Sequence, residues 1–120
     1  MKAFTVALIA SLSSSGSPVT VTAGPNPITV SGNFVLFPTL TTSPVTAYAH
    51  GGLSPYSYEI NYVSGDMDIT ANLFTDSASF EATAVAAPSE YNATFCFKVT
   101  DSIGAIGYSP NVDVTITFTS

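Results

Sequence analysis

Two runs of strictly alternating apolar and polar residues near the end of the chain constrain the fold more than any other feature. In the first run, one face carries the apolar side chains of Tyr91, Ala93, Phe95, Phe97 and Val99. In the second run, the same holds for Val112, Val114, Ile116 and Phe118. A period of two predicts strands with one buried side. Between the runs, Asp101 can accept backbone N–H bonds and Gly104 tolerates positive φ, so we expect an antiparallel hairpin.

Shorter runs of the same kind occupy the preceding part of the chain, with turn residues roughly every ten positions. Apolar alternation resumes near Val19, Ile28, Val45, Tyr56, Ile69 and Phe80. No helical periodicity competes with it. We therefore predict one all-β domain over residues 18–120, a sandwich of about seven to nine antiparallel strands with an N-terminal extension.

The run Phe34-Val35-Leu36-Phe37 lacks alternation and ends at Pro38. We interpret it first as a strand that is buried on both faces, because apolar runs usually belong to the core. The alternative is an exposed patch that contacts a partner. In that case Phe34, Leu36 and Phe37 are predicted to bind the partner.

The first residues resemble a secretory signal, with Lys2, a short apolar stretch and then small residues. Thr5 interrupts the apolar stretch, however, and no small-x-small cleavage pattern follows. We therefore expect residues 1–17 to belong to the mature protein, as an arm or edge strand followed by a linker. Phe4, Val6 and Leu8 share one side of such a strand and are further predicted partner-binding residues.

The charge balance excludes several classes of partner. The net charge is −6, Lys2 and Lys98 are the only basic side chains, and the chain contains no arginine. Nucleic-acid binding needs phosphate-neutralising side chains, so we expect none. Anionic membranes are disfavoured for the same reason, and no apolar run approaches the roughly 20 residues that span a bilayer. We therefore expect no membrane partner.

Residues for catalysis or metal binding are scarce. His50 and Cys96 are the only residues of their types, which is too few for a zinc site, and no nucleophile-elbow pattern surrounds any serine. Three loop aspartates, Asp66, Asp68 and Asp76, are interpreted as solvated, with a weak calcium site as the alternative. We expect a protein that is not an enzyme, with no catalytic residues, no cofactor and no metal.

The tyrosines and the single cysteine leave two alternatives open. Tyr58 and Tyr91 are expected to point inward, whereas Tyr48 and Tyr108 are free to face outward and could form part of a carbohydrate platform. Cys96 alternates with Phe95 and Phe97, so we expect a half-covered thiol on the outer face of its sheet. An intermolecular bridge through Cys96 is the alternative.

Two motifs resemble a known family. Gly51-Gly52-Leu53-Ser54-Pro55-Tyr56-Ser57-Tyr58 resembles the Gly-Gly-x-x-Pro-Tyr-x-Tyr turn and strand of bacterial and phage immunoglobulin-like repeats, including the polycystic-kidney-disease (PKD) type. Val99-Thr100-Asp101-Ser102-Ile103-Gly104-Ala105 resembles their Val-Thr-Asp-x-x-Gly-Ala hairpin. The resemblance covers about residues 43–120 and implies an immunoglobulin-like β-sandwich without catalytic residues. The chain departs from the family in lacking a tryptophan on the third strand.

Among proteins with such domains, phage decoration, cement and tail proteins are most similar to a small, cysteine-poor β-domain with an N-terminal arm. The resemblance thus implies a structural protein of the virion that binds the major capsid protein or other virion subunits at the capsid surface. Homo-oligomerisation stays open. The alternative is a carbohydrate- or receptor-binding adhesion module of a phage tail or cell surface, in an extracellular setting.

Overall fold

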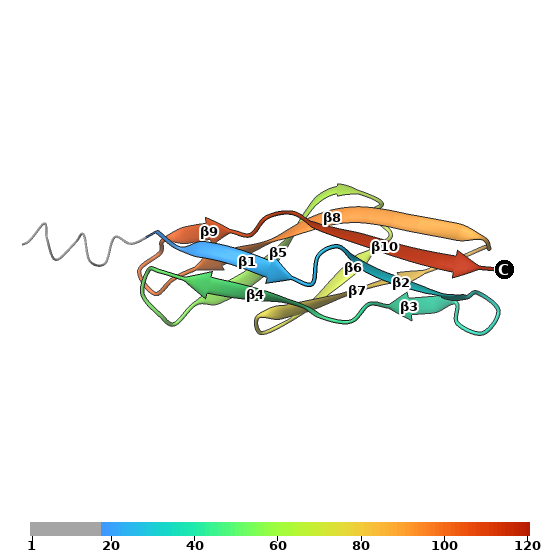
Figure 1. Cartoon of the computed structure of the whole chain (residues 1–120), viewed down its shortest axis with the longest axis horizontal. Coiled ribbons are helices and arrows are strands. Elements are labelled where there is room, and N and C mark those ends of the chain that lie inside the picture. Colours follow the sequence, from blue (N-terminus) through green and yellow to red (C-terminus); the bar gives the residue numbers. More distant parts are fainter. Residues whose placement is uncertain (1–17) are drawn as a thin grey trace, which may run out of the picture.

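The computed structural model describes residues 18–120, which form ten strands in two packed sheets (Figure 1). In the first sheet β4 and β7 are central, and its strands are β1 (Thr20–Gly24), β3 (Thr39–Thr41), β4 (Val45–His50), β6 (Thr70–Phe74) and β7 (Ser77–Thr83). In the second sheet β8 and β10 are central, and its strands are β2 (Ile28–Asn33), β5 (Ser57–Gly65), β8 (Ser89–Thr100), β9 (Ile106–Tyr108) and β10 (Val112–Thr119). The predicted immunoglobulin-like β-sandwich is confirmed. This described part of the chain contains no helix able to cross a membrane.

The core lies between the two sheets and is built on the predicted pair of strands. β8 and β10 pair antiparallel from Val112 opposite Phe95 to Phe118 opposite Ser89. Their alternating apolar side chains point inward, and Phe97 and Phe118 are fully buried. Phe95 meets Phe80 of β7 in the facing sheet, with ring centroids 4.8 Å apart. The alternation therefore predicts the buried faces of these strands correctly.

One strand in each sheet is interrupted, and a hydroxyl group bridges each interruption. Between β3 and β4, the Oγ1 of Thr42 accepts a hydrogen bond of 3.1 Å from the backbone N–H of Phe80. Between β9 and β10, the Oγ of Ser109 accepts one of 2.9 Å from the N–H of Phe97. Both hydroxyl-bearing residues are buried. Each replaces an acceptor that the neighbouring strand would otherwise supply, so the central strand keeps its buried donor satisfied.

These interruptions account for the strand number. Counting β3 with β4 and β9 with β10 as single strands reduces the ten strands to eight, within the predicted range. All pairings are antiparallel except that of β2 with β10, which is parallel. The parallel pair arises because the chain passes from β1 in one sheet to β2 in the other. Asn26 holds this crossing: its side-chain amide donates to the carbonyl of Asn111 and accepts from the N–H of Asp113, at 2.7 and 3.0 Å.

Asp101 ties together the loops at the end of the sandwich where β1 begins. Its carboxylate accepts backbone N–H bonds from Leu53, Ile103 and Ala105 at 2.8 to 3.0 Å, and the residue is buried. This links the two family-like motifs physically, because Leu53 belongs to the first and the other residues to the second. Burial raises the pKa of the Asp101 carboxyl, but the backbone N–H bonds outweigh burial and hold this pKa below its ordinary value.

The strand expected over residues 34–37 is absent. β2 ends at Asn33, and the apolar run forms the loop between β2 and β3. The alternation expected near Ile69 matches only in part, because β6 starts at Thr70, directly after the buried Ile69. Apolar character alone does not distinguish a buried strand from an exposed loop, so residues 34–37 had no local pattern that could decide between the two.

Candidate functional site

The loop over residues 34–38 presents three consecutive apolar side chains to solvent. Val35 is 78% exposed, Leu36 70% and Phe37 55%. Phe34, by contrast, is partly buried and packs against the core. The loop lies at the end of the sandwich that also carries the C-terminus (Figure 1). Of the two alternatives for this run, the structure therefore favours an exposed apolar surface. Phe34 attaches this loop to the core.

Every backbone N–H group of residues 34–37 has an acceptor within the protein. The Oδ1 of Asn33 accepts from Val35 at 2.9 Å and from Leu36 at 3.2 Å. The carbonyl of Asn33 accepts from Phe37 at 2.8 Å, and the carbonyl of Thr119 accepts from Phe34 at 2.9 Å. Pro38 has no N–H group. A surface pressed against this loop would therefore bury apolar side chains without stranding a backbone donor.

A second loop, over residues 84–88, lies beside the first. The N–H of Ala84 donates to the carbonyl of Pro38 at 2.9 Å, next to the paired residues Thr39 and Thr83. Val85 follows and is 91% exposed. We call the side chains of Val35, Leu36, Phe37 and Val85 together the apolar pole. Val85 was not predicted from the sequence, although its position is out of step with Phe80, Ala82 and Ala84, which face the core.

Both loops of the apolar pole lie in segments of the sequence that are free of charge. No Asp, Glu, Lys or Arg occurs over residues 18–58, which also include strands β1 to β4, or over residues 82–89. Next to the pole is an open hollow of about 480 Å³, lined by the first residues of β8 and the last of β10. Glu90 lines this hollow and accepts a hydrogen bond from the Asn92 side chain. The pole is thus uncharged, with a single acidic side chain at its border.

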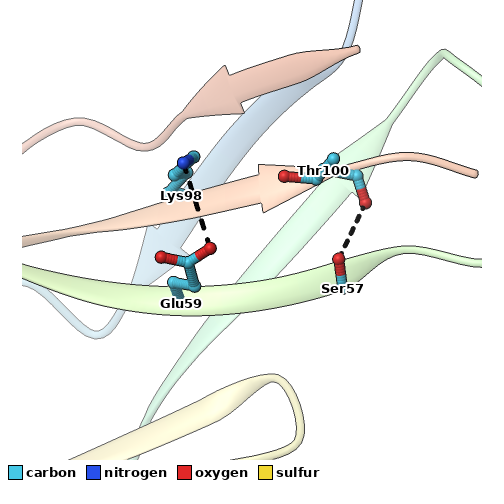
Figure 2. Close-up of polar contacts among 4 residues, drawn as sticks. All are labelled: Ser57, Glu59, Lys98 and Thr100. Atoms are coloured by element: carbon cyan, nitrogen blue, oxygen red, sulfur yellow. Dashed lines mark hydrogen bonds and ion pairs between the residues drawn. The ribbon is translucent and has the colours of Figure 1, made fainter. Parts of the chain in front are cut away.

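The charged side chains of the described residues lie from Glu59 onward, and all but one of them are acidic. Lys98 is the only basic side chain over residues 18–120, and it pairs with Glu59 at 3.9 Å across β8 and β5. Figure 2 shows this pair on the outer face of the second sheet, beside the bond from the Ser57 hydroxyl to the Thr100 carbonyl. Since both partners are partly exposed, the pair adds little to stability. The pair places the ammonium group of Lys98 beside the carboxylate of Glu59.

The other candidate residues are spread over the molecule. Phe4, Val6 and Leu8 lie outside the described residues, together with the predicted arm. His50 is exposed at the end of β4. Asp66 accepts the backbone N–H of Asn92 at 2.7 Å, so its carboxylate already serves a loop contact. Over residues 18–120 no three His, Cys, Asp or Glu side chains gather closely enough to hold a metal ion.

Tyr48 and Tyr108 face outward as predicted, at 55% and 57% exposure, but they belong to different sheets and form no common platform. Cys96 is half-buried on the outer face of β8, also as predicted, and burial raises the pKa of its thiol. A raised pKa disfavours the reactive thiolate at neutral pH. The positions of these side chains therefore match the sequence-based expectation, whereas a bridge through Cys96 stays a prediction.

No family model and no curated protein sequence matches the chain. Among solved structures, the chain is similar to the PKD domain of human KIAA0319, determined in solution, with a TM-score of 0.53. The two chains are 18% identical, and the match covers 86% of this chain and 84% of the other. At this identity the likeness concerns the fold, and it supports the PKD-type immunoglobulin-like sandwich that the two motifs imply.

Proposed function

We propose that the chain is a non-enzymatic structural protein of a virion, which decorates or cements a phage capsid by binding major capsid subunits. The observation that carries the proposal is the apolar pole, an uncharged and exposed apolar surface at one end of the sandwich. Leu36 and Phe37 of the pole are among the residues predicted from sequence to contact a partner. The motif resemblance to phage immunoglobulin-like repeats supplies the virion setting.

The mechanism is stabilisation by binding. A protein that binds assembled subunits, and not separated ones, shifts the equilibrium toward the shell by an amount that grows with the free protein concentration over its Kd. Contacts that span two adjacent subunits would add to this effect. The arm predicted over residues 1–17 offers a second contact, because an extended segment can add as a strand to an exposed sheet edge.

The test is co-sedimentation of the purified full chain with capsids that lack it, assembled from the major capsid protein of the same virus. We expect saturable binding and a rise in the temperature at which the capsids disassemble. Removing residues 1–17 should weaken binding while the sandwich still folds. Capsids that neither bind the chain nor gain stability would refute the proposal.

A second candidate, carbohydrate binding, is favoured by one arrangement on the first sheet. Phe74 is 81% exposed, and it pairs with Ser77 of β7, which in turn pairs with Thr46 of β4. Side chains in such cross-strand positions share a face, so Phe74 and Tyr48 flank the hydroxyls of Thr46 and Ser77, which are 2.9 Å apart. Binding to a glycan array that disappears in Phe74→Ala, with capsid binding absent, would favour this candidate.

A further inference from the structure

We infer that the apolar pole docks end-on against an apolar, uncharged patch of a capsid subunit, with the loops 34–38 and 84–88 acting as one anchor. This inference rests on the proposed function. It specifies the chemistry of the partner surface that the pole contacts. Three features of the described residues support it: the distribution of charge, the satisfied backbone of the first loop, and the size of the exposed surface.

The charge distribution selects the kind of partner surface. Apart from Lys98, which is paired, the charged side chains of the sandwich are all acidic. These acidic side chains lie from Glu59 onward, and contact through them would favour a basic partner, with binding that weakens in salt. The pole carries no charge, so its best complement is an uncharged apolar surface. Binding through the pole should then be almost independent of salt concentration.

The backbone of the first loop makes the pole ready for docking. With the N–H groups of residues 34–37 bonded inside the protein, burial of the loop desolvates no unpaired donor. Asn33, through its side chain and its carbonyl, holds three of these groups and therefore fixes how Val35 and Leu36 project. A surface ordered before binding loses less conformational entropy on contact.

The size of the pole argues for a large partner and against a second copy of this chain. A stable interface usually involves about 20–30 residues on each side. The pole exposes only four apolar side chains, so two poles in contact would provide too small an area for a stable dimer. A capsid subunit can surround the pole and also contact the rim of the adjoining hollow, where Pro88 and Thr119 lie.

The experiment compares full-chain variants in the capsid co-sedimentation assay at 0.1 and 1 M NaCl. Leu36→Ser and Val85→Ser should each weaken binding about tenfold or more, as expected for apolar side chains that become buried in an interface. Ile103→Ser is the matched control, since Ile103 is 59% exposed in a loop at the opposite end of the sandwich. It should bind like the unmodified chain. For the unmodified chain we expect affinities at the two salt concentrations that agree within about twofold.

Several results would overturn the inference. If the chain binds capsids but Leu36→Ser and Val85→Ser bind equally well, the docking surface is wrong and the proposed function stands. A steep loss of binding in 1 M NaCl would place the contact on the acidic side chains from Glu59 onward and not on the pole. If analytical ultracentrifugation detected dimers that Leu36→Ser abolishes, the partner of the pole would be a second copy of the chain. If the chain bound phosphatidylcholine vesicles through the pole, the partner would be a lipid surface. A chain that binds no capsid refutes both the inference and the proposed function.

Discussion

The hydroxyl of Ser109 should be worth far more to stability than its size suggests. It accepts the N–H of Phe97 at 2.9 Å and donates to the carbonyl of Pro110 at 2.8 Å. Phe97 is fully buried in the longest strand of the sandwich, and Ser109 is only 7% exposed. Water therefore has little access to the N–H of Phe97. In Ser109→Ala this donor loses its acceptor, because the interruption between β9 and β10 offers no carbonyl in its place.

Leaving a buried donor unsatisfied costs about 1–3 kcal/mol. For a domain of about 100 residues, each kcal/mol lowers the Tm by roughly 5 °C, so Ser109→Ala should melt about 5–15 °C below the unmodified chain. Thr42→Val removes the equivalent acceptor from Phe80 in the other sheet and keeps the side-chain shape. It should therefore destabilise by a similar amount. Because the two sites are in different sheets and share no partner, their effects should add.

The assay is thermal and urea unfolding followed by circular dichroism, with amide hydrogen exchange as a local readout. The matched controls are Ser31→Ala and Thr29→Val, on the exposed face of β2, which should change stability by less than about 0.5 kcal/mol. The Phe97 amide should exchange faster in Ser109→Ala, beyond what the global loss of stability explains. If Ser109→Ala and Ser31→Ala have the same Tm and the same urea midpoint, the Ser109 hydroxyl does not contribute the stability assigned to it.

Three further perturbations test other parts of the fold. Thr75 has a φ of 60°, a left-handed conformation that is strained for a β-branched residue, so Thr75→Gly should raise the free energy of unfolding by about 0.5–1 kcal/mol in urea melts. A Cβ at Gly107 would overlap the backbone carbonyl of Val19, so Gly107→Ala should lower stability by about 1–3 kcal/mol and increase exchange at the start of β1. The pKa of Asp101 is lowered in the folded state, so its stabilising effect is present above pH 4 or so and is lost as the pH falls through the lower folded value. Asp101→Asn should therefore have a lower free energy of unfolding at pH 7, and this free energy should fall less steeply below about pH 4 than that of the unmodified chain. An equally steep fall would exclude this role of the carboxylate.

The strands and their buried faces could be predicted because alternation is a local signal. Each of the runs ending at Val99 and Phe118 fixes which side faces the core, whatever the strand pairs with. The interruptions at Thr42 and Ser109 could not be predicted in this way. Each is followed within two residues by a proline, but the acceptor role of the hydroxyl depends on a strand that is distant in sequence.

The apolar pole was predictable only in part, for a physical reason. A run such as the one at 34–37 can be buried or exposed, and the choice depends on whether β2 ends before it or continues into it. Here Asn33 ends the strand by accepting N–H groups from its own next turn. Val85 becomes part of the same surface only because β3 and β7 pair at Thr39 and Thr83. No pattern within either loop indicates that pairing.

The fold separates the residues that hold the sandwich together from those proposed to bind. Ser109 and Thr42 are buried between paired strands, whereas Leu36 and Val85 make the end surface and are largely exposed. Ser109→Ala should therefore lower the Tm and leave capsid affinity intact below the melting range. Leu36→Ser should lower capsid affinity and leave the Tm unchanged, because an exposed side chain contributes little to folding. If Leu36→Ser lowered the Tm as much as Ser109→Ala does, any loss of binding could be traced to unfolding. The binding data would then no longer support the pole as a contact surface.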